Sequence, residues 1–283
     1  MKEIADVDVL EDVTRRINAL GDTEILNERN LCELLYGKTI NPYPHVRYSE
    51  RPDLCAIHLL QGYVVLLVDN SPTAMILPTT FFELNSQIEE YTQTPIIATF
   101  TRILRLLAIW LSIYFIPLWI VLVATQNPTR LQLHLVEDVN LFGFGFSILF
   151  ADIAVEWIRQ ALIHTPDMLS SIMGFIAVFV LGDMAIGLGA YSEEILLVVA
   201  LCNIGNLLTP NYELSLANKF FRIVISCLSL LFGLSGFCIG VLFHVSVLLS
   251  TKSMKYPYLY PLCPFSFREC KKQLFGKMIQ IDS

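Results

Sequence analysis

Three closely spaced apolar segments between Met168 and Ser250 constrain this chain more than any other stretch. The polar insert from Thr209 to Leu214 separates the second segment from the third. At ~1.5 Å per helical residue, each segment is long enough to cross the ~30 Å hydrocarbon core of a bilayer. We therefore expect an integral membrane protein.

The composition supports a soluble part followed by a membrane part. Hydrophobic residues make up 54% of the 283 residues and charged residues 16%, against about 25% charged residues in ordinary soluble domains. We expect a soluble α+β domain over residues 1–98, a transmembrane domain over 99–250 and a basic cytoplasmic tail over 251–283. The net charge of -7 argues against a nucleic-acid partner, which needs a basic face.

The soluble part has both helical and extended patterns. Apolar residues recur at helical spacing from Val7 to Tyr36, which predicts two short helices separated by Gly21-Asp22. The run Glu50-Arg51-Pro52-Asp53 begins either a helix or a turn. Strands are predicted at Leu54–Leu60, Tyr63–Val68 and Ala74–Leu77.

The membrane part is expected to be an α-helical bundle of about four spans. Pro117 lies inside the first span and predicts a kink there. The spans are predicted at Ile103–Ala124, Met168–Ala190, Ile195–Leu208 and Phe221–Ser250. The positive-inside rule places the tail and the Arg102 end in the cytoplasm, which requires an even number of crossings. Lys219 and Arg222 then fall on the outer side, against that rule.

The segment 138–163 is apolar in its first half yet carries charged side chains further on. Asp152, Glu156 and Arg159 recur at three- and four-residue spacing, so they share one helical face. This pattern predicts an amphipathic or re-entrant helix that faces other protein or water. Asp152 and Glu156 either sit at the mouth of a pore or pair with Arg159 or Lys219.

Three polar residues in the expected spans are candidates for an ion path. Asp183 either attracts cations or lies near enough to the span end to reach the headgroups, because an acid within a span needs a polar cavity or a partner. Asn203 and Asn206 make one stripe of their helix polar. Such a stripe lines a pore or, more often, hydrogen-bonds to a neighbouring helix.

The sequence offers no sign of catalysis. No hydrolase, kinase, metal or dinucleotide pattern survives inspection, so we expect no catalytic residue, metal or cofactor. The GxxxG from Gly236 to Gly240 is explained by close helix packing. The seven cysteines show no paired pattern and are expected to be reduced thiols.

Six motifs occur in the order found in a known family. They are Glu50-Arg51-Pro52-Asp53, Val65 to Asp69 with Ser71-Pro72, Phe100-xx-Ile103-Leu104-Arg105, Asp152-xxx-Glu156-xx-Arg159, Pro210-Asn211-Tyr212-Glu213-Leu214, and Pro257-Tyr258-Leu259-xx-Leu262-x-Pro264-Phe265. Together they resemble the A subunit of GerA-type spore germination receptors. The stretch from Ser192 to Asn218 is similar to the stage V sporulation protein AF branch.

The resemblance implies a multi-pass protein of the spore inner membrane that acts in germination. A subunits of this family are thought to assemble as oligomers, with pentamers expected, and to form ligand-gated channels for monovalent cations. The AF branch resembles a channel that amplifies the response with a small partner membrane protein. Family members usually carry a further subdomain before the part that matches residues 7–95, so residues 1–98 correspond to the second half of the family's N-terminal region.

Two functions remain open at this point. The first is a subunit of a cation-conducting channel, with the 195–208 helix and the Asp152/Glu156 helix as pore elements. The second is a non-conducting receptor or scaffold subunit that binds other germination proteins and transmits nutrient signals. A secondary transporter is less favoured, because the sequence has no internal repeat. Membrane lipid is an expected partner in each case.

Overall fold

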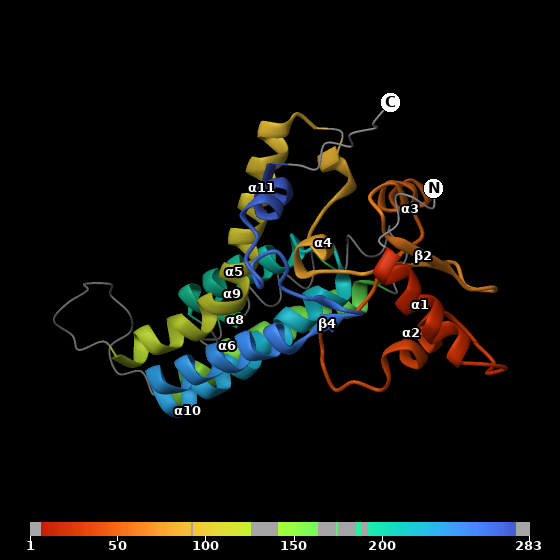
Figure 1. Cartoon of the computed structure of the whole chain (residues 1–283). Coiled ribbons are helices and arrows are strands. Elements are labelled where there is room, and N and C mark those ends of the chain that lie inside the picture. Colours follow the sequence, from red (N-terminus) through yellow and green to blue (C-terminus); the bar gives the residue numbers. More distant parts are fainter. Residues whose placement is uncertain are drawn as a thin grey trace. The chain divides into compact units, whose positions relative to one another are not determined.

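The computed structural model describes residues 7–91, 93–125, 141–163, 174, 185–187 and 192–275. The chain divides into two compact units, each built from separate stretches of sequence (Figure 1). The first unit comprises residues 1–104, 210–217 and 245–283, and the second comprises 105–209 and 218–244. Each unit is described below by itself.

The first unit begins with the two helices that the spacing predicts. They are α1 (Val7–Ala19) and α2 (Glu28–Tyr36). The Asn27 side chain accepts a hydrogen bond from the Asn30 amide and caps α2, because the first amides of a helix lack partners within it. The helices bury Val9, Val13 and Leu31 in a core.

A three-stranded antiparallel sheet completes that core. Its order is β1 (Arg47–Ser49), β3 (Ala74–Leu77) and β2 (Val64–Leu67). Both predicted strands at 63–68 and 74–77 are confirmed. All four side chains of β3 are buried, as expected of the central strand.

The strand predicted at Leu54–Leu60 is wrong, because these residues belong to the helix α3 (Pro52–Leu60). Pro52 occupies the start of the helix, where its missing amide hydrogen is no loss, and Asp53 lies in the first turn. The short apolar run that follows fits a strand or a helix equally by pattern. Two short elements follow the sheet, the helix α4 (Phe81–Leu84) and a 3-10 turn (Ile88–Tyr91).

Residues after the last long helix also belong to the first unit. β4 (Lys252–Ser253) pairs with β5 (Tyr256–Pro257), and α11 (Phe267–Phe275) follows. The Ser253 hydroxyl donates to the His45 carbonyl at 2.6 Å and accepts from the Thr79 amide at 2.9 Å. These bonds join the C-terminal segment to the N-terminal domain.

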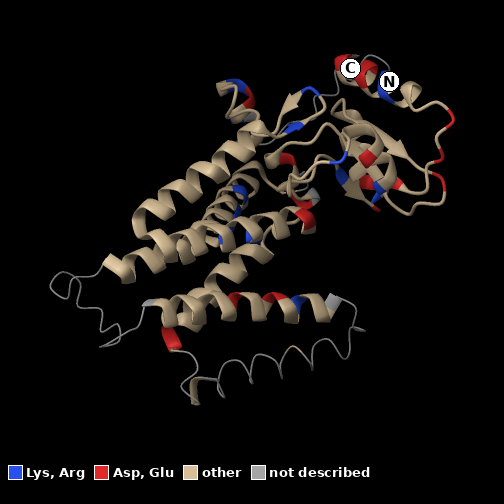
Figure 2. Cartoon of the chain, turned by 90° about the horizontal axis from the view of Figure 1, so that it is seen from below, with Lys and Arg blue, Asp and Glu red and all other residues tan. Residues whose placement is uncertain are grey.

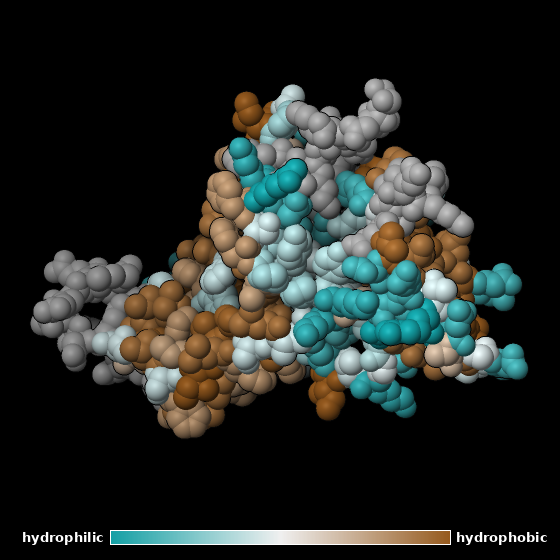
Figure 3. All heavy atoms as spheres, in the orientation of Figure 1, coloured by the Kyte–Doolittle hydropathy of each residue, from teal (hydrophilic) through white to brown (hydrophobic). Residues whose placement is uncertain are grey.

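The second unit is helical. Its described helices are α5 (Pro95–Thr125), α6 (Leu141–Ile163), α8 (Ala185–Gly187), α9 (Glu193–Leu207) and α10 (Tyr212–Ser250), of which α5 and α10 begin in the first unit. Among the described residues, α5 and α10 are the two helices long and apolar enough to cross a membrane. Most of the span expected at 168–190 lies outside the described residues. Figure 3 shows apolar side chains gathered over the long helices, with hydrophilic ones over α1 and α2.

The span expected from Phe221 to Ser250 is not one straight helix, because α10 turns back on itself at Gly233. Gly233 has φ 61° and ψ -138°, a conformation that glycine tolerates because it lacks a Cβ. The rings of Phe221 and His244, 23 positions apart in sequence, have centroids 4.6 Å apart. A straight helix would separate them by ~35 Å. α10 is therefore a hairpin of two antiparallel arms, seen side by side in Figure 1.

The GxxxG lies in the second arm of this hairpin and packs against the first. A Cβ placed on Gly236 would lie 1.9 Å from the Leu228 carbonyl oxygen, and one on Gly240 would lie 3.1 Å from Ile225. The two arms therefore approach closely at these glycines, as the motif predicts.

Candidate functional site: a buried ion-pair cluster

Charged residues are rare on the long helices (Figure 2), and several of them meet inside the second unit. α6 places Asp152, Glu156 and Arg159 on one face, as their spacing predicts, and Asp152 is only 1% exposed. The opposite face of α6 exposes large aromatic side chains. They are Phe142, Phe146, Phe150 and Trp157. α6 thus buries both charged and apolar residues, the latter including Phe144 and Ile148, and exposes large aromatic side chains on its outer side.

α10 supplies the two cations opposite Asp152. Arg222, 1% exposed, donates from Nε to Asp152 Oδ2 at 3.0 Å and from Nη2 to Asp152 Oδ1 at 2.6 Å. This two-point contact is the strongest geometry for a guanidinium and a carboxylate. The ammonium of Lys219 donates to Glu156 Oε2 at 3.1 Å and lies 3.6 Å from Asp152 Oδ1.

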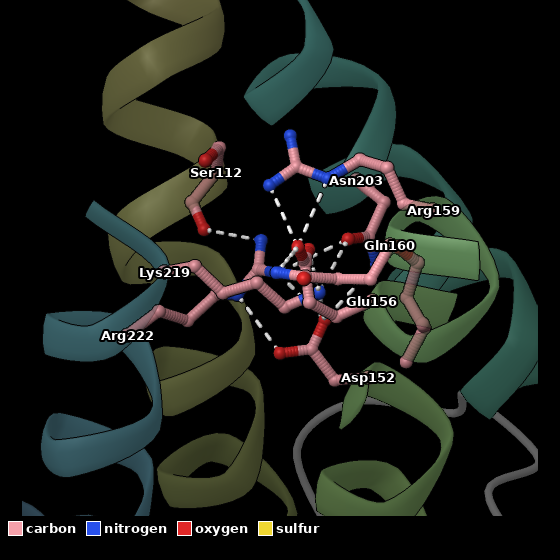
Figure 4. Close-up of polar contacts among 9 residues, drawn as sticks. Ser112, Asp152, Glu156, Arg159, Gln160, Asn203, Lys219 and Arg222 are labelled. Carbon is pink, nitrogen blue, oxygen red and sulfur yellow. Dashed lines mark hydrogen bonds and ion pairs between the residues drawn. The ribbon is translucent and has the colours of Figure 1, made fainter. Parts of the chain in front are cut away.

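α9 and α5 complete the cluster with neutral oxygen and nitrogen atoms. Asn203 on α9 donates to Asp152 Oδ1 at 3.0 Å, and its own oxygen accepts from Lys219 at 3.1 Å. On α5, the Ser112 carbonyl accepts from Arg222 Nη1 at 3.0 Å. Four helices therefore meet through one polar network (Figure 4).

The closeness of the helices explains how these side chains reach one another. A Cβ on Gly205 would lie 2.5 Å from the Ala108 carbonyl oxygen, so α9 lies directly against α5. A Cβ on Gly145 would meet the tip of the Leu230 side chain, so α6 also contacts the first arm of α10. Glycine at both positions leaves room for these contacts.

The cluster holds three cations and two carboxylates. Arg159 lies beside Glu156, with Nη2 to Oε1 at 2.8 Å, and Lys219 approaches the other oxygen of that carboxylate. Burying a charge in an apolar region is costly unless it is paired and hydrogen-bonded. Here each carboxylate has cationic partners, so the charge is balanced locally with one positive charge in excess. A cluster of paired charges like this can hold the helices in one register. Its carboxylates can also pair with different cations when a helix moves.

Three of the predicted site residues, Asp152, Glu156 and Asn203, come together in this cluster. The pairing of Glu156 with Arg159 and Lys219 is the second of the two alternatives that the sequence left open. Asn206 lies one turn further along α9 and is 2% exposed. Asp183 lies outside the described residues.

Two of the six motifs lie at helix starts. Glu50 precedes α3, whose first residue is Pro52, and Arg51 pairs with Asp53 at 2.9 Å. These charged groups are largely exposed and stabilise the fold little. At the start of α10, Asn211 caps the helix between Pro210 and Tyr212. There Leu214 is fully buried, and Glu213 accepts from Arg29 of α2 at 3.2 Å.

Sequence reasoning missed Arg222 as the main partner of Asp152. A signal was present in the first arm of α10, where polar residues recur at spacings of four, three, four and three. These residues are Ser215, Lys219, Arg222, Ser226 and Ser229, each at most 3% exposed. That regular polar stripe in an apolar segment indicates an inward face, on which Lys219 and Arg222 pair with acids of the same chain.

No group of three or more potential metal-ligating side chains occurs in the described part of the chain.

The sequence was compared with known proteins. The model of the family described as Bacillus/Clostridium GerA spore germination protein matches residues 1–281. No solved structure matches the chain.

Individual relatives agree with this result. Stage V sporulation protein AF of Bacillus subtilis (strain 168) is 39% identical over 270 residues, covering 94% of this chain and 55% of that protein. Spore germination protein KA of the same organism is 27% identical over 277 residues, covering 96% and 51%. An uncharacterized membrane protein, YfkQ, is 25% identical over 273 residues, covering 95% and 53%. The chain thus spans about half the length of these relatives, and it belongs to the GerA family of spore germination proteins.

Proposed function

We propose that this chain forms part of a subunit of an oligomeric cation channel of the spore inner membrane, which acts in or amplifies germination. The observation that carries the proposal is a cluster of charged residues between helices with apolar outer faces, in which Asp152, Lys219 and Arg222 are buried and Glu156 and Arg159 are partly buried. Charged groups inside a membrane are rare and commonly mark ion pathways. A homo-oligomer, with a pentamer as the expected form, and a small partner membrane protein follow from the family resemblance.

The cluster also suggests how such a path is closed. Carboxylate, amide and carbonyl oxygens are the groups that coordinate hard cations. In this conformation those of Asp152, Glu156 and Asn203 are occupied by Lys219 and Arg222. A permeating cation needs the same oxygens, so this arrangement corresponds to a closed state. Opening requires the first arm of α10 to withdraw its two cations.

The make-up of the first unit supports a membrane topology for this channel. Residues before 104, the 210–217 segment and the chain after 245 form one compact unit. If that unit lies in the cytoplasm with the basic tail, an even number of crossings separates Leu104 from Pro210. The α10 hairpin then begins and ends on the cytoplasmic side.

A second function is favoured by the same cluster. Each carboxylate in it is neutralised by cations of this chain, which suits a rigid, non-conducting receptor or scaffold subunit equally well. Such a subunit transmits a signal through partner proteins and passes no ions itself.

Cation efflux from liposomes that contain the purified protein separates the two functions. We expect efflux from the wild type and an efflux rate raised about tenfold in Glu156→Gln, because the charge that holds Lys219 in the closed arrangement is lost. Glu193→Gln, an exposed acid in the first turn of α9, is the matched control and should conduct as the wild type does. No efflux from folded, oligomeric wild-type protein would support the scaffold function instead.

A further inference from the structure

The segment that follows α10 has a charge opposite to that of the whole chain. Residues 251–275 contain five basic residues and one acidic residue, whereas the chain carries a net charge of -7. The basic residues are Lys252, Lys255, Arg268, Lys271 and Lys272. The side chains of Lys252, Lys255, Arg268 and Lys271 are exposed. This concentration of positive charge is suited to an anionic surface.

The same segment exposes large apolar side chains among its cations. Phe265 is 70% exposed, Phe267 is 73% exposed and Leu262 is 49% exposed. Phe267 begins α11, and Arg268 and Lys271 lie three positions apart on that helix. A helix of nine residues is too short to be stable alone in water. Its pattern of aromatic and basic residues is that of a helix lying in a membrane interface.

Contacts within the first unit hold α11 beside the start of a candidate span. Arg102 Nη1 donates to the Gln273 carbonyl at 2.8 Å, and Arg102 also pairs with the buried Glu90. Arg102 lies in the third turn of α5, one of the two described helices able to cross a membrane. The end of α11 is therefore bonded to the first part of α5, a candidate membrane helix.

We propose that residues 252–271 form a docking surface for anionic phospholipid headgroups. Phe265 and Phe267 insert between the headgroups, and the cations at Lys252, Arg268 and Lys271 contact their phosphates. The occupant is lipid because the surface combines exposed aromatic side chains with excess positive charge. It is also continuous with two membrane helices, since it follows α10 directly and is bonded to α5.

A photoreactive probe identifies the occupant of this surface. p-Benzoylphenylalanine is placed at Phe267 in the full chain, reconstituted in vesicles of phosphatidylcholine alone or in an equimolar mixture with phosphatidylglycerol. After illumination, mass spectrometry identifies the adduct. We expect lipid adducts, with about tenfold more phosphatidylglycerol than phosphatidylcholine in the mixture. The same probe at Leu26, which is 75% exposed on the N-terminal domain, should give no lipid adduct.

Several results would overturn the proposal. They are an adduct with this or another polypeptide, equal capture of the two lipids, or no adduct from Phe267 while a probe at the exposed Leu107 of α5 captures lipid.

The role of the positive charge is tested by Arg268→Gln/Lys271→Gln, which should abolish the preference for phosphatidylglycerol. The control Arg15→Gln/Lys38→Gln removes the same two positive charges from the N-terminal domain. It should leave the preference for phosphatidylglycerol unchanged. Since none of these readouts requires conduction, the outcome is independent of the channel proposal.

Discussion

Replacing Arg222 with glutamine is expected to lower the free energy of unfolding by about 3 to 5 kcal/mol. The variant leaves Asp152, which is 1% exposed, without its two-point partner, and it also removes the bond to the Ser112 carbonyl. Of its partners in the described part of the chain, Asp152 then keeps only Lys219 at 3.6 Å and the Asn203 amide, and breaking a buried ion pair is among the most destabilising single substitutions. Thermal unfolding in a fixed detergent measures the effect.

Arg51→Gln provides the matched control for this substitution. Arg51 pairs with Asp53 and Glu89, but all three side chains are more than half exposed. Solvent-exposed ion pairs contribute about 0 to 1 kcal/mol. If Arg222→Gln destabilises the protein no more than Arg51→Gln does, the pair with Asp152 is not a buried ion pair of the kind described.

Replacing Gly236 with alanine is expected to be the most damaging change in the α10 hairpin. The added methyl group would meet the Leu228 backbone carbonyl at 1.9 Å, so the two arms must separate. Forcing extra atoms into a packed interior costs about 1 to 3 kcal/mol and sometimes more. The loss is measured as the fall in unfolding temperature.

Gly240→Ala is the control for Gly236→Ala, because both glycines lie in the same arm. A Cβ at Gly240 would lie 3.1 Å from the Ile225 side chain, which can adjust by a few tenths of an ångström. The gain in helix propensity from glycine to alanine is about the same at both positions, so it cancels in the comparison. Equal unfolding temperatures for the two variants would contradict the antiparallel packing of the arms.

Local sequence patterns predicted the local elements well. The apolar period of α1 and α2 follows from burial of one helix face, whereas the continuous apolar run Ala74–Leu77 follows from burial of all four side chains of the central strand. α3 was mistaken for a strand because its seven apolar-rich residues have no clear period. The helical start provided by Pro52 and Asp53 decides in favour of a helix.

Long-range arrangements were harder to predict, for physical reasons. The stretch around Gly233 is apolar on both sides, so composition does not distinguish a long helix from two arms joined by one positive φ. Asp152 and Arg222 are 70 positions apart, and no local spacing rule links residues at such a separation. The pairing of Glu156 with Arg159 was one of the two alternatives that the sequence offered, because three positions along a helix bring the two side chains together.

The most direct test of the ion-path proposal replaces the ion pair by apolar residues. In Asp152→Leu/Arg222→Met, both charges disappear together, and well-packed apolar substitutes for a buried ion pair are commonly neutral or stabilising. We expect this double variant to unfold at or above the wild-type temperature and to lose cation efflux from liposomes. Wild-type efflux from the stable double variant would contradict the account and leave the cluster a purely structural one.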